Sequence, residues 1–154
     1  MYPSSLAVLL ARLQAVRPLS VQERHLAQSV FAEHLSLDSI RICASGWIWR
    51  GYAMSPNGHV YFHPDDYCID FAQQSLSRQA WLMHELTHVW QVQQGIKVVR
   101  QAIFDRRYDY VLESGRAFLS YGVEQQAQMV QDYFLRRACG QSCDALARCL
   151  PFLK

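Results

Sequence analysis

The sequence predicts an α+β domain, mostly helical, in which a small antiparallel sheet flanks one long helix. Its 154 residues suit a single domain over residues 1–154, because no internal repeat or low-complexity linker divides them. About half of the residues are apolar (51%), which suffices for a buried core and excludes a wholly disordered chain. Helical patterns precede and follow the strand-like segments, so the order differs from the alternating βαβ pattern of a parallel sheet.

Two helices are expected in the first third of the chain. The first covers about Ser5–Ala15, where leucines recur every three or four residues until Pro18 breaks the run. The second begins at a capping box, in which Ser20 accepts the amide of Glu23 and the Glu23 carboxylate reaches back. We expect this second helix to continue to about His34.

Strand character follows in the middle of the chain. Ile40–Cys43, Trp47–Trp49 and His59–His63 alternate or run apolar, and Ser55–Gly58 reads as a turn. An Asn-Gly pair within that turn favours a two-stranded hairpin. These segments predict a short antiparallel sheet.

The remaining chain is predicted to be helical, apart from an ambiguous stretch over residues 105–121. The expected helices are Ser77–Gln94, Lys97–Phe104 and Val123–Ala138. Gly95 is expected just after the first of them, in the left-handed conformation that commonly ends a helix.

The charge balance excludes some function classes. Fifteen Lys and Arg against 13 Asp and Glu give a net charge of +2, far from that of a bulk nucleic-acid binder or a polybasic membrane binder. The longest N-terminal apolar run, Leu6–Ala11, is too short for a secretory signal or a membrane span. We therefore expect a protein made in the cytoplasm without a signal peptide and without membrane insertion.

The most informative segment is an H-E-x-x-H motif inside the long predicted helix. At about 100° per residue, His84 and His88 lie roughly 40° apart on adjacent turns, close enough to bind one ion. Glu85 lies beside them, where its carboxylate can reach a water on that ion as a general base. The pattern indicates a catalytic zinc site.

Two structural histidines produced by chance are the alternative to a metal site. A shuffled chain of this composition would contain the motif in roughly one case per hundred. The helical wheel favours the metal site, because one face is apolar and the histidines share the other. The apolar face carries Leu82, Met83, Leu86, Val89 and Trp90, and the opposite face carries Trp81, His84, His88 and Gln91.

A catalytic zinc ion needs a third protein ligand. Gln94 occupies the position where a third histidine would follow six residues after His88, so an acidic residue further along is expected. Glu113 and Glu124 are the glutamates available there. We favour Glu124, which opens a predicted helix with the small Ala127 one turn further on. The alternative role for Glu124 is an acid that stabilises the helix N-terminus.

Other candidate ligands fit a zinc site less well. In a strand, His59, Tyr61 and His63 share one face and could line a cleft, but the two histidines would be roughly 13 Å apart, so we expect residues at a surface or cleft edge. Cys139 and Cys143 would supply only two thiolates, which leaves a structural zinc site incomplete.

These motifs resemble a bacterial family usually labelled "vgr-related", which is similar to the metallopeptidase domains of type VI secretion spike proteins. The similarity covers most of the chain and is carried by Met1-Tyr-Pro3, Val16–Leu19, Asp70–Ala72, Leu82–Gln93, Tyr108–Tyr110 and Glu124–Phe134. It implies a zincin-like fold of the minimal gluzincin kind. It also implies His84, His88 and Glu124 as zinc ligands and Glu85 as the catalytic base.

The resemblance further implies that the sheet's edge strand pairs with an extended peptide, for which His59–His63 is our candidate. It assigns no electrophile for the oxyanion, and Tyr108, Tyr110 and Tyr121 remain open for this role. Association with spike components, and delivery to the periplasm or to a target cell by a secretion system, follow from the same kinship.

The leading hypothesis is a zinc-dependent metallopeptidase that hydrolyses amide bonds in a peptide or protein substrate. One alternative is an accessory or binding module of a secretion system with a structural zinc ion, which would need four protein ligands. A peptidoglycan amide hydrolase would use the same site, so the sequence does not separate it from a peptidase.

Overall fold

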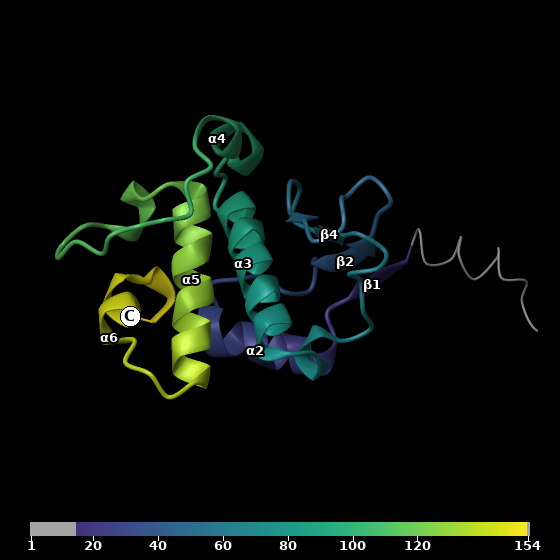
Figure 1. Cartoon of the computed structure of the whole chain (residues 1–154), viewed down its shortest axis with the longest axis horizontal. Helices are drawn as coiled ribbons and strands as arrows, with labels where there is room; N and C mark the ends of the chain where they lie inside the picture. The colour runs from purple at the N-terminus through teal and green to yellow at the C-terminus, as the bar shows by residue number, and fades with distance from the viewer. Residues whose placement is uncertain (1–14, 154) are drawn as a thin grey trace, which may run out of the picture.

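The computed structural model describes residues 15–153, which form five α-helices and a four-stranded sheet (Figure 1). The helices are α2 (Val21–Phe31), α3 (Leu76–Gln93), α4 (Val98–Phe104), α5 (Val123–Ala138) and α6 (Asp144–Cys149). The strands are β1 (Val16–Pro18), β2 (Arg41–Ala44), β3 (Ala53–Met54) and β4 (Val60–Phe62). Short 3-10 turns cover Phe71–Gln73, Phe118–Ser120 and Pro151–Leu153. The helix expected over Ser5–Ala15 lies outside the described residues, apart from Ala15.

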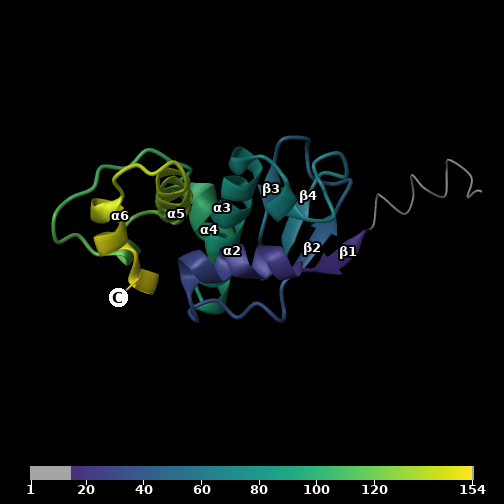
Figure 2. The same ribbon diagram turned by 90° about the horizontal axis from the view of Figure 1, so that it is seen from below.

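The layers are arranged around α3. The sheet lies on one side of α3, α5 lies on the other, and α6 lies beyond α5, while α2 crosses the layers at the end opposite α4 (Figures 1 and 2). Every residue of α3 from Leu82 to Gln91 is therefore buried. The apolar face and the histidine face are both covered, which makes α3 the central helix of an α+β fold.

The sheet is mixed, so the expectation of a purely antiparallel sheet is wrong. Its strand order is β1-β2-β4-β3, with β2 and β4 parallel and the two outer pairs antiparallel. The turn at Asn57-Gly58 does form a hairpin, but its first strand is the two-residue β3. Because the chain turns back once into β3 and again into β4, β4 ends up running in the same direction as β2.

The sequence predicts a strand at Trp47–Trp49, but this segment is an irregular turn in the structure. Trp47 is 93% exposed and Trp49 is 79% exposed, so neither indole packs into the core. The apolar run was typical of a buried strand, but these residues lie in the connection between β2 and β3. Short apolar runs carry no information about whether a neighbouring strand is available.

The predicted helices agree closely with the observed ones. The capping box is confirmed, because Ser20 Oγ accepts the Glu23 amide at 3.0 Å and Glu23 Oε2 accepts the Ser20 amide at 2.8 Å. The helix that it starts ends at Phe31, slightly before the expected His34. Gly95 ends α3 with φ +79°, and α5 has the bounds that the sequence predicted.

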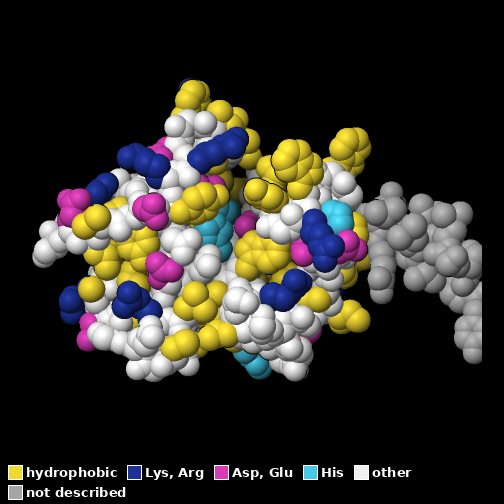
Figure 3. All heavy atoms as spheres, in the orientation of Figure 1, with side chains coloured by type: hydrophobic (Ala, Val, Ile, Leu, Met, Phe, Trp, Pro, Cys, Tyr) yellow, Lys and Arg dark blue, Asp and Glu magenta, His cyan; other side chains and the backbone are white. Residues whose placement is uncertain are grey.

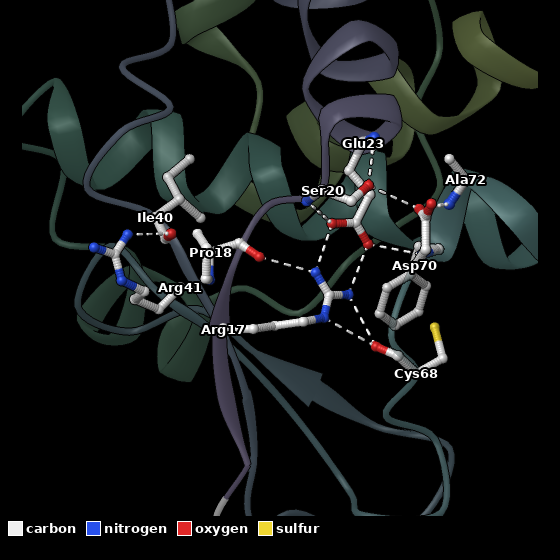
Figure 4. A network of polar contacts seen from close by, with 10 residues as sticks. Arg17, Pro18, Ser20, Glu23, Ile40, Arg41, Cys68, Asp70 and Ala72 are labelled. Carbon is white, nitrogen blue, oxygen red and sulfur yellow. Dashed lines mark hydrogen bonds and ion pairs between the residues drawn. The ribbon is translucent and has the colours of Figure 1, made fainter.

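Glu23 also joins three segments into one polar network (Figure 4). Its fully buried carboxylate accepts two hydrogen bonds of 2.7 Å from the Arg17 guanidinium of β1. It also accepts the amide of Phe71 at 2.7 Å, at the turn that leads into α3. Arg17 donates in addition to the backbone carbonyl of Cys68. The network holds the sheet, α2 and the segment before α3 together.

The Cys139 side chain is exposed, Cys143 is half-buried, and the two are not bridged. Among the helices within residues 15–153, none combines the length and the apolar character needed to cross a bilayer.

Candidate metal centre

Three side chains from two helices converge on one point. His84 and His88 lie one turn apart on α3, and Glu124 lies in the first turn of α5. Glu124 Oε2 is 3.3 Å from His84 Nε2 and 3.2 Å from His88 Nε2. One ligand atom from each residue lies within 4.8 Å of the others, so this group could hold a metal ion. The choice of Glu124 over Glu113 agrees with this geometry.

Close packing of α3 against α5 brings the group together. Ala127 is fully buried one turn after Glu124, and this small side chain allows α5 to lie close to α3. His84 is 7% exposed and His88 is 5% exposed. The cluster is therefore shielded from bulk water on most sides, which strengthens electrostatic interactions within it.

Charge and protonation in the cluster are strongly coupled. Burial acts to raise the pKa of Glu124, but hydrogen bonds with His84 and His88 outweigh it and lower that pKa to about 2. Burial alone would lower the pKa of His88, whereas its hydrogen bond to Glu124 and the charges of Glu85 and Glu124 raise it. The carboxylate therefore favours positive charge at the point where the three residues meet.

The donor set fits a metal ion with nitrogen and oxygen ligands. Two imidazoles and one carboxylate form a common catalytic zinc set, in which a fourth position stays available. The two Nε2 atoms and the carboxylate oxygen point at the same place from separate helices. A metal cation at this point could bind the three side chains together, whereas here the two histidines share the Glu124 carboxylate as their hydrogen-bond partner.

Glu85 lies beside the cluster, and a residue from outside α3 and α5 holds its side chain. It is 4% exposed, and its Oε2 accepts a 2.9 Å hydrogen bond from Ser55 Oγ. Ser55 follows the edge strand β3, so the sheet contributes directly to the site. Nothing in the sequence pattern indicated Ser55, because its contact with Glu85 depends on how the hairpin packs against α3.

A hollow of about 320 Å³ opens over these residues. Its floor is formed by His84, Glu85, His88 and Glu124. One wall comes from the region of β3, with Tyr52, Ala53, Met54, Ser55 and Pro56, and the other comes from α4 and the residues after it, with Val98, Val99, Ala102, Ile103, Arg106 and Tyr108. Figure 3 shows histidine surface at the centre of this face, with hydrophobic side chains on both sides. Sequence reasoning did not identify the α4 wall.

The three candidate tyrosines lie in different places. The Tyr108 ring lines the hollow, and its centroid is 6.0 Å from that of His84. The Tyr110 hydroxyl donates instead to Asp132 at 2.7 Å. The Tyr121 hydroxyl donates to the backbone carbonyl of Val111 at 3.1 Å, away from the cluster. Of the three, only Tyr108 is brought to the site.

His59 and Tyr61 are not brought to the metal cluster. They line a different hollow of the sheet together with Arg41, Cys43 and Trp47. The expectation that His59–His63 forms the edge strand is wrong, because β4 lies between β2 and β3 and both of its edges are paired. The edge strand beside the cluster is β3.

The sequence is similar to that of a type VI secretion spike protein. No protein-family model matches the sequence. The chain is 38% identical over 136 residues to the type VI secretion system spike protein VgrG2b of Pseudomonas aeruginosa. This match takes in 80% of the chain but only 13% of the spike protein, so the chain spans a small part of that relative's length.

The solved structures give a match over nearly the full length. The effector domain of Pseudomonas aeruginosa VgrG2b superposes with a TM-score of 0.76 and 35% identity, covering 97% of this chain and 93% of that domain. Fold and site thus define an α+β domain with a buried His-His-Glu cluster, and its fold is shared with an effector domain of a type VI secretion spike protein. At this identity and coverage, the chain belongs to the family of the VgrG2b effector domain.

Proposed function

We propose that this chain is a zinc-dependent peptidase of the zincin-like, minimal gluzincin kind that acts as an effector associated with type VI secretion. The observation that carries the proposal is the convergence of His84, His88 and Glu124 within 4.8 Å, with Glu85 beside them under an open hollow. The kinship with the VgrG2b effector domain supports the association with a secretion spike.

Each site residue has a defined task in this proposal. His84, His88 and Glu124 would hold the zinc ion, because the Nε2 atoms of the two histidines and a carboxylate oxygen of Glu124 lie close together. When bound, zinc supplies a Lewis acid that polarises the substrate carbonyl and lowers the pKa of water. The Glu85 carboxylate takes the proton from the attacking water and passes it to the nitrogen of the leaving amine. Ser55 holds Oε2 of Glu85, so the carboxylate keeps one orientation through both transfers.

Tyr108 is the proposed donor to the developing oxyanion. Burial raises the pKa of its phenol, and the negative charges of Glu124 and Glu85 add to that effect. The hydroxyl therefore keeps its proton at neutral pH and can donate it in a hydrogen bond. Its ring lies beside His84, on the side of the hollow that α4 and the following residues form.

The same geometry supports a closed structural metal site less well. Such a site needs four protein ligands. Within residues 15–153 the metal-binding group comprises three, and an open hollow lies above them. The hollow would leave room for a substrate beside an ion held by these three residues.

The decisive experiment compares wild type with Glu85→Gln and His84→Ala. Zinc content is measured by elemental analysis, and hydrolysis is measured with a library of quenched fluorescent peptides and with purified peptidoglycan. We expect Glu85→Gln to keep zinc and to lose about 10²- to 10⁴-fold in rate, because only the general base is removed. We expect His84→Ala to lose both zinc and activity.

Glu33→Gln is the matched control, since Glu33 is exposed on the surface after α2. Wild-type hydrolysis by Glu85→Gln would refute the peptidase mechanism. The peptidoglycan assay separates the two classes of amide substrate.

A further inference from the structure

The side chain of Gln91 connects the metal cluster to the start of α5. Gln91 is fully buried on α3, three residues after His88. Its Oε1 lies 2.8 Å from His88 Nδ1. Its Nε2 donates to the Val123 carbonyl at 3.0 Å and to Gln126 Oε1 at 2.9 Å.

Two backbone carbonyls determine which way these amides point. Gln126 Nε2 donates to the carbonyl of Tyr121 at 2.7 Å, so the Gln126 oxygen faces Gln91. The carbonyl oxygen of Val123 and the side-chain oxygen of Gln126 can only accept hydrogen bonds. Both must therefore receive N–H groups from Gln91. A rotated Gln91 amide would place its oxygen against two acceptors. The Gln91 oxygen is therefore directed at His88.

We propose that Gln91 is a positioning residue that fixes the ring of His88 with its proton on Nδ1 and its bare Nε2 toward the metal. The amide oxygen of Gln91 accepts the Nδ1–H proton, which leaves the Nε2 lone pair for coordination. This inference rests on the metal site of the proposed function. It adds a residue outside the H-E-x-x-H motif to the machinery that prepares the site.

The same contacts set the position of Glu124 relative to His88. Val123 and Gln126 flank Glu124 in the first turn of α5. Gln91 thus bonds at once to one ligand and to the turn that carries another ligand. A shift of α5 along α3 would therefore break the Gln91 hydrogen bonds and also move the Glu124 carboxylate away from His88.

His84 provides an internal comparison. Its Nδ1 atom is buried and has no hydrogen-bond partner within the described part of the chain. Protein contacts therefore hold the Nδ1–H group of His88 but not that of His84. Outer-shell groups of this kind typically change metal affinity about 10- to 100-fold.

The test uses the full chain loaded with zinc, and Gln91→Met as the main variant. Nuclear magnetic resonance of the wild type should give an Nδ1–H signal from His88 that exchanges slowly with water. The corresponding His84 signal should exchange faster. In Gln91→Met we expect loss of the protected His88 signal, and competition with a chelator should show zinc binding weakened about 10- to 100-fold.

Gln93→Met is the matched control on the same helix. Gln93 also makes two hydrogen bonds, to the backbone of Ser36, but far from the cluster. It should lose stability without a change in zinc affinity. Gln126→Met removes one of the two acceptors that hold the Gln91 amide, so it should weaken zinc binding less than Gln91→Met does. If Gln91→Met fails to fold, Gln126→Met takes its place in the test.

The outcomes separate this inference from the proposed function. A wild type that binds no zinc would refute the metal site itself, and this inference with it. If wild type binds zinc, and Gln91→Met and Gln126→Met bind it with the same affinity, only the role of Gln91 is refuted. A His88 Nδ1–H signal that exchanges with water as fast as that of His84 would also refute the role of Gln91 alone.

Discussion

Ser55 donates a 2.9 Å hydrogen bond from Oγ to Oε2 of Glu85, and both side chains are buried. The serine follows the edge strand β3, while the glutamate lies at the middle of α3. The bond therefore links the edge of the sheet to the proposed general base. Hydrogen bonds to charged groups are worth about 1.5–3 kcal/mol, so this one can determine the orientation of the carboxylate.

Replacing this serine should affect turnover and leave metal binding intact. We expect Ser55→Ala to lower kcat by about one order of magnitude, because Glu85 loses the contact that orients it. Zinc affinity should match that of wild type. Steady-state kinetics and chelator competition measure the two quantities. Ser77→Ala, at an exposed position in the first turn of α3, is the control, and an unchanged kcat in Ser55→Ala would contradict the role of this bond.

The two downstream glutamates should behave differently. Glu124→Gln removes a proposed ligand and should weaken zinc binding by more than the roughly 10- to 100-fold expected for an outer-shell group. Glu113→Gln should bind zinc as wild type does, because Glu113 pairs with Arg116 at 2.8 Å on the surface and is 60% exposed. Titration with zinc in the presence of a competing chelator distinguishes them. Equal affinities would exclude Glu124 as a ligand.

Loss of the Glu23 carboxylate should destabilise the whole fold. Glu23→Ala leaves Arg17 largely buried without its partner and the Phe71 amide without an acceptor. Breaking a buried ion pair in this way typically costs about 3–5 kcal/mol. Urea denaturation of this variant, with the exposed Glu33→Ala as the control, measures the change. A free energy of unfolding within about 1 kcal/mol of wild type would argue against the network in Figure 4.

Tyr110 should make stability depend on pH in the alkaline range. Burial raises the pKa of its phenol above the ordinary value of 10.0, and the hydrogen bond to Asp132 raises it further. The folded protein then keeps a proton that the unfolded chain releases near pH 10. The protonated phenol therefore stabilises the fold fully below pH 10, and this contribution is lost as the pH rises toward the pKa of Tyr110 in the folded state.

The measurement compares wild type with Tyr110→Phe by urea denaturation between about pH 8 and pH 11. At the lower pH, wild type should be more stable by about 1–2 kcal/mol, because the variant lacks the hydrogen bond to Asp132. The difference should shrink above pH 10. A difference that stays constant over this range would show that the phenol does not titrate as described.

Some features could be predicted because they depend on near neighbours in the chain. The capping box of Ser20 and Glu23 requires only four residues and one helical turn. His84 and His88 are placed one turn apart by the helical repeat itself, whatever surrounds α3. Glu124 could also be chosen as a candidate ligand, since the first turn of a predicted helix with a small residue one turn later is a local pattern, and the structure places Glu124 beside both histidines.

Other features required knowledge of long-range packing. The apolar residues of Trp47–Trp49 resemble a strand, but within residues 15–153 no strand pairs with them. His59 and Tyr61 had a cleft-lining pattern, yet the position of β4 inside the sheet directs them to a different hollow. Among three similar tyrosines, only Tyr108 lies beside His84.

By itself, therefore, the sequence determined where the helices run and which α3 side chains can meet one ion, because backbone hydrogen bonds within a helix set those spacings locally. Tertiary structure alone decided the strand order, the contact of Ser55 with Glu85 and the bond of Gln91 to the start of α5. These pairs are separated by about 30 residues, and they meet only because burying the faces of α3 forces the sheet and α5 against it.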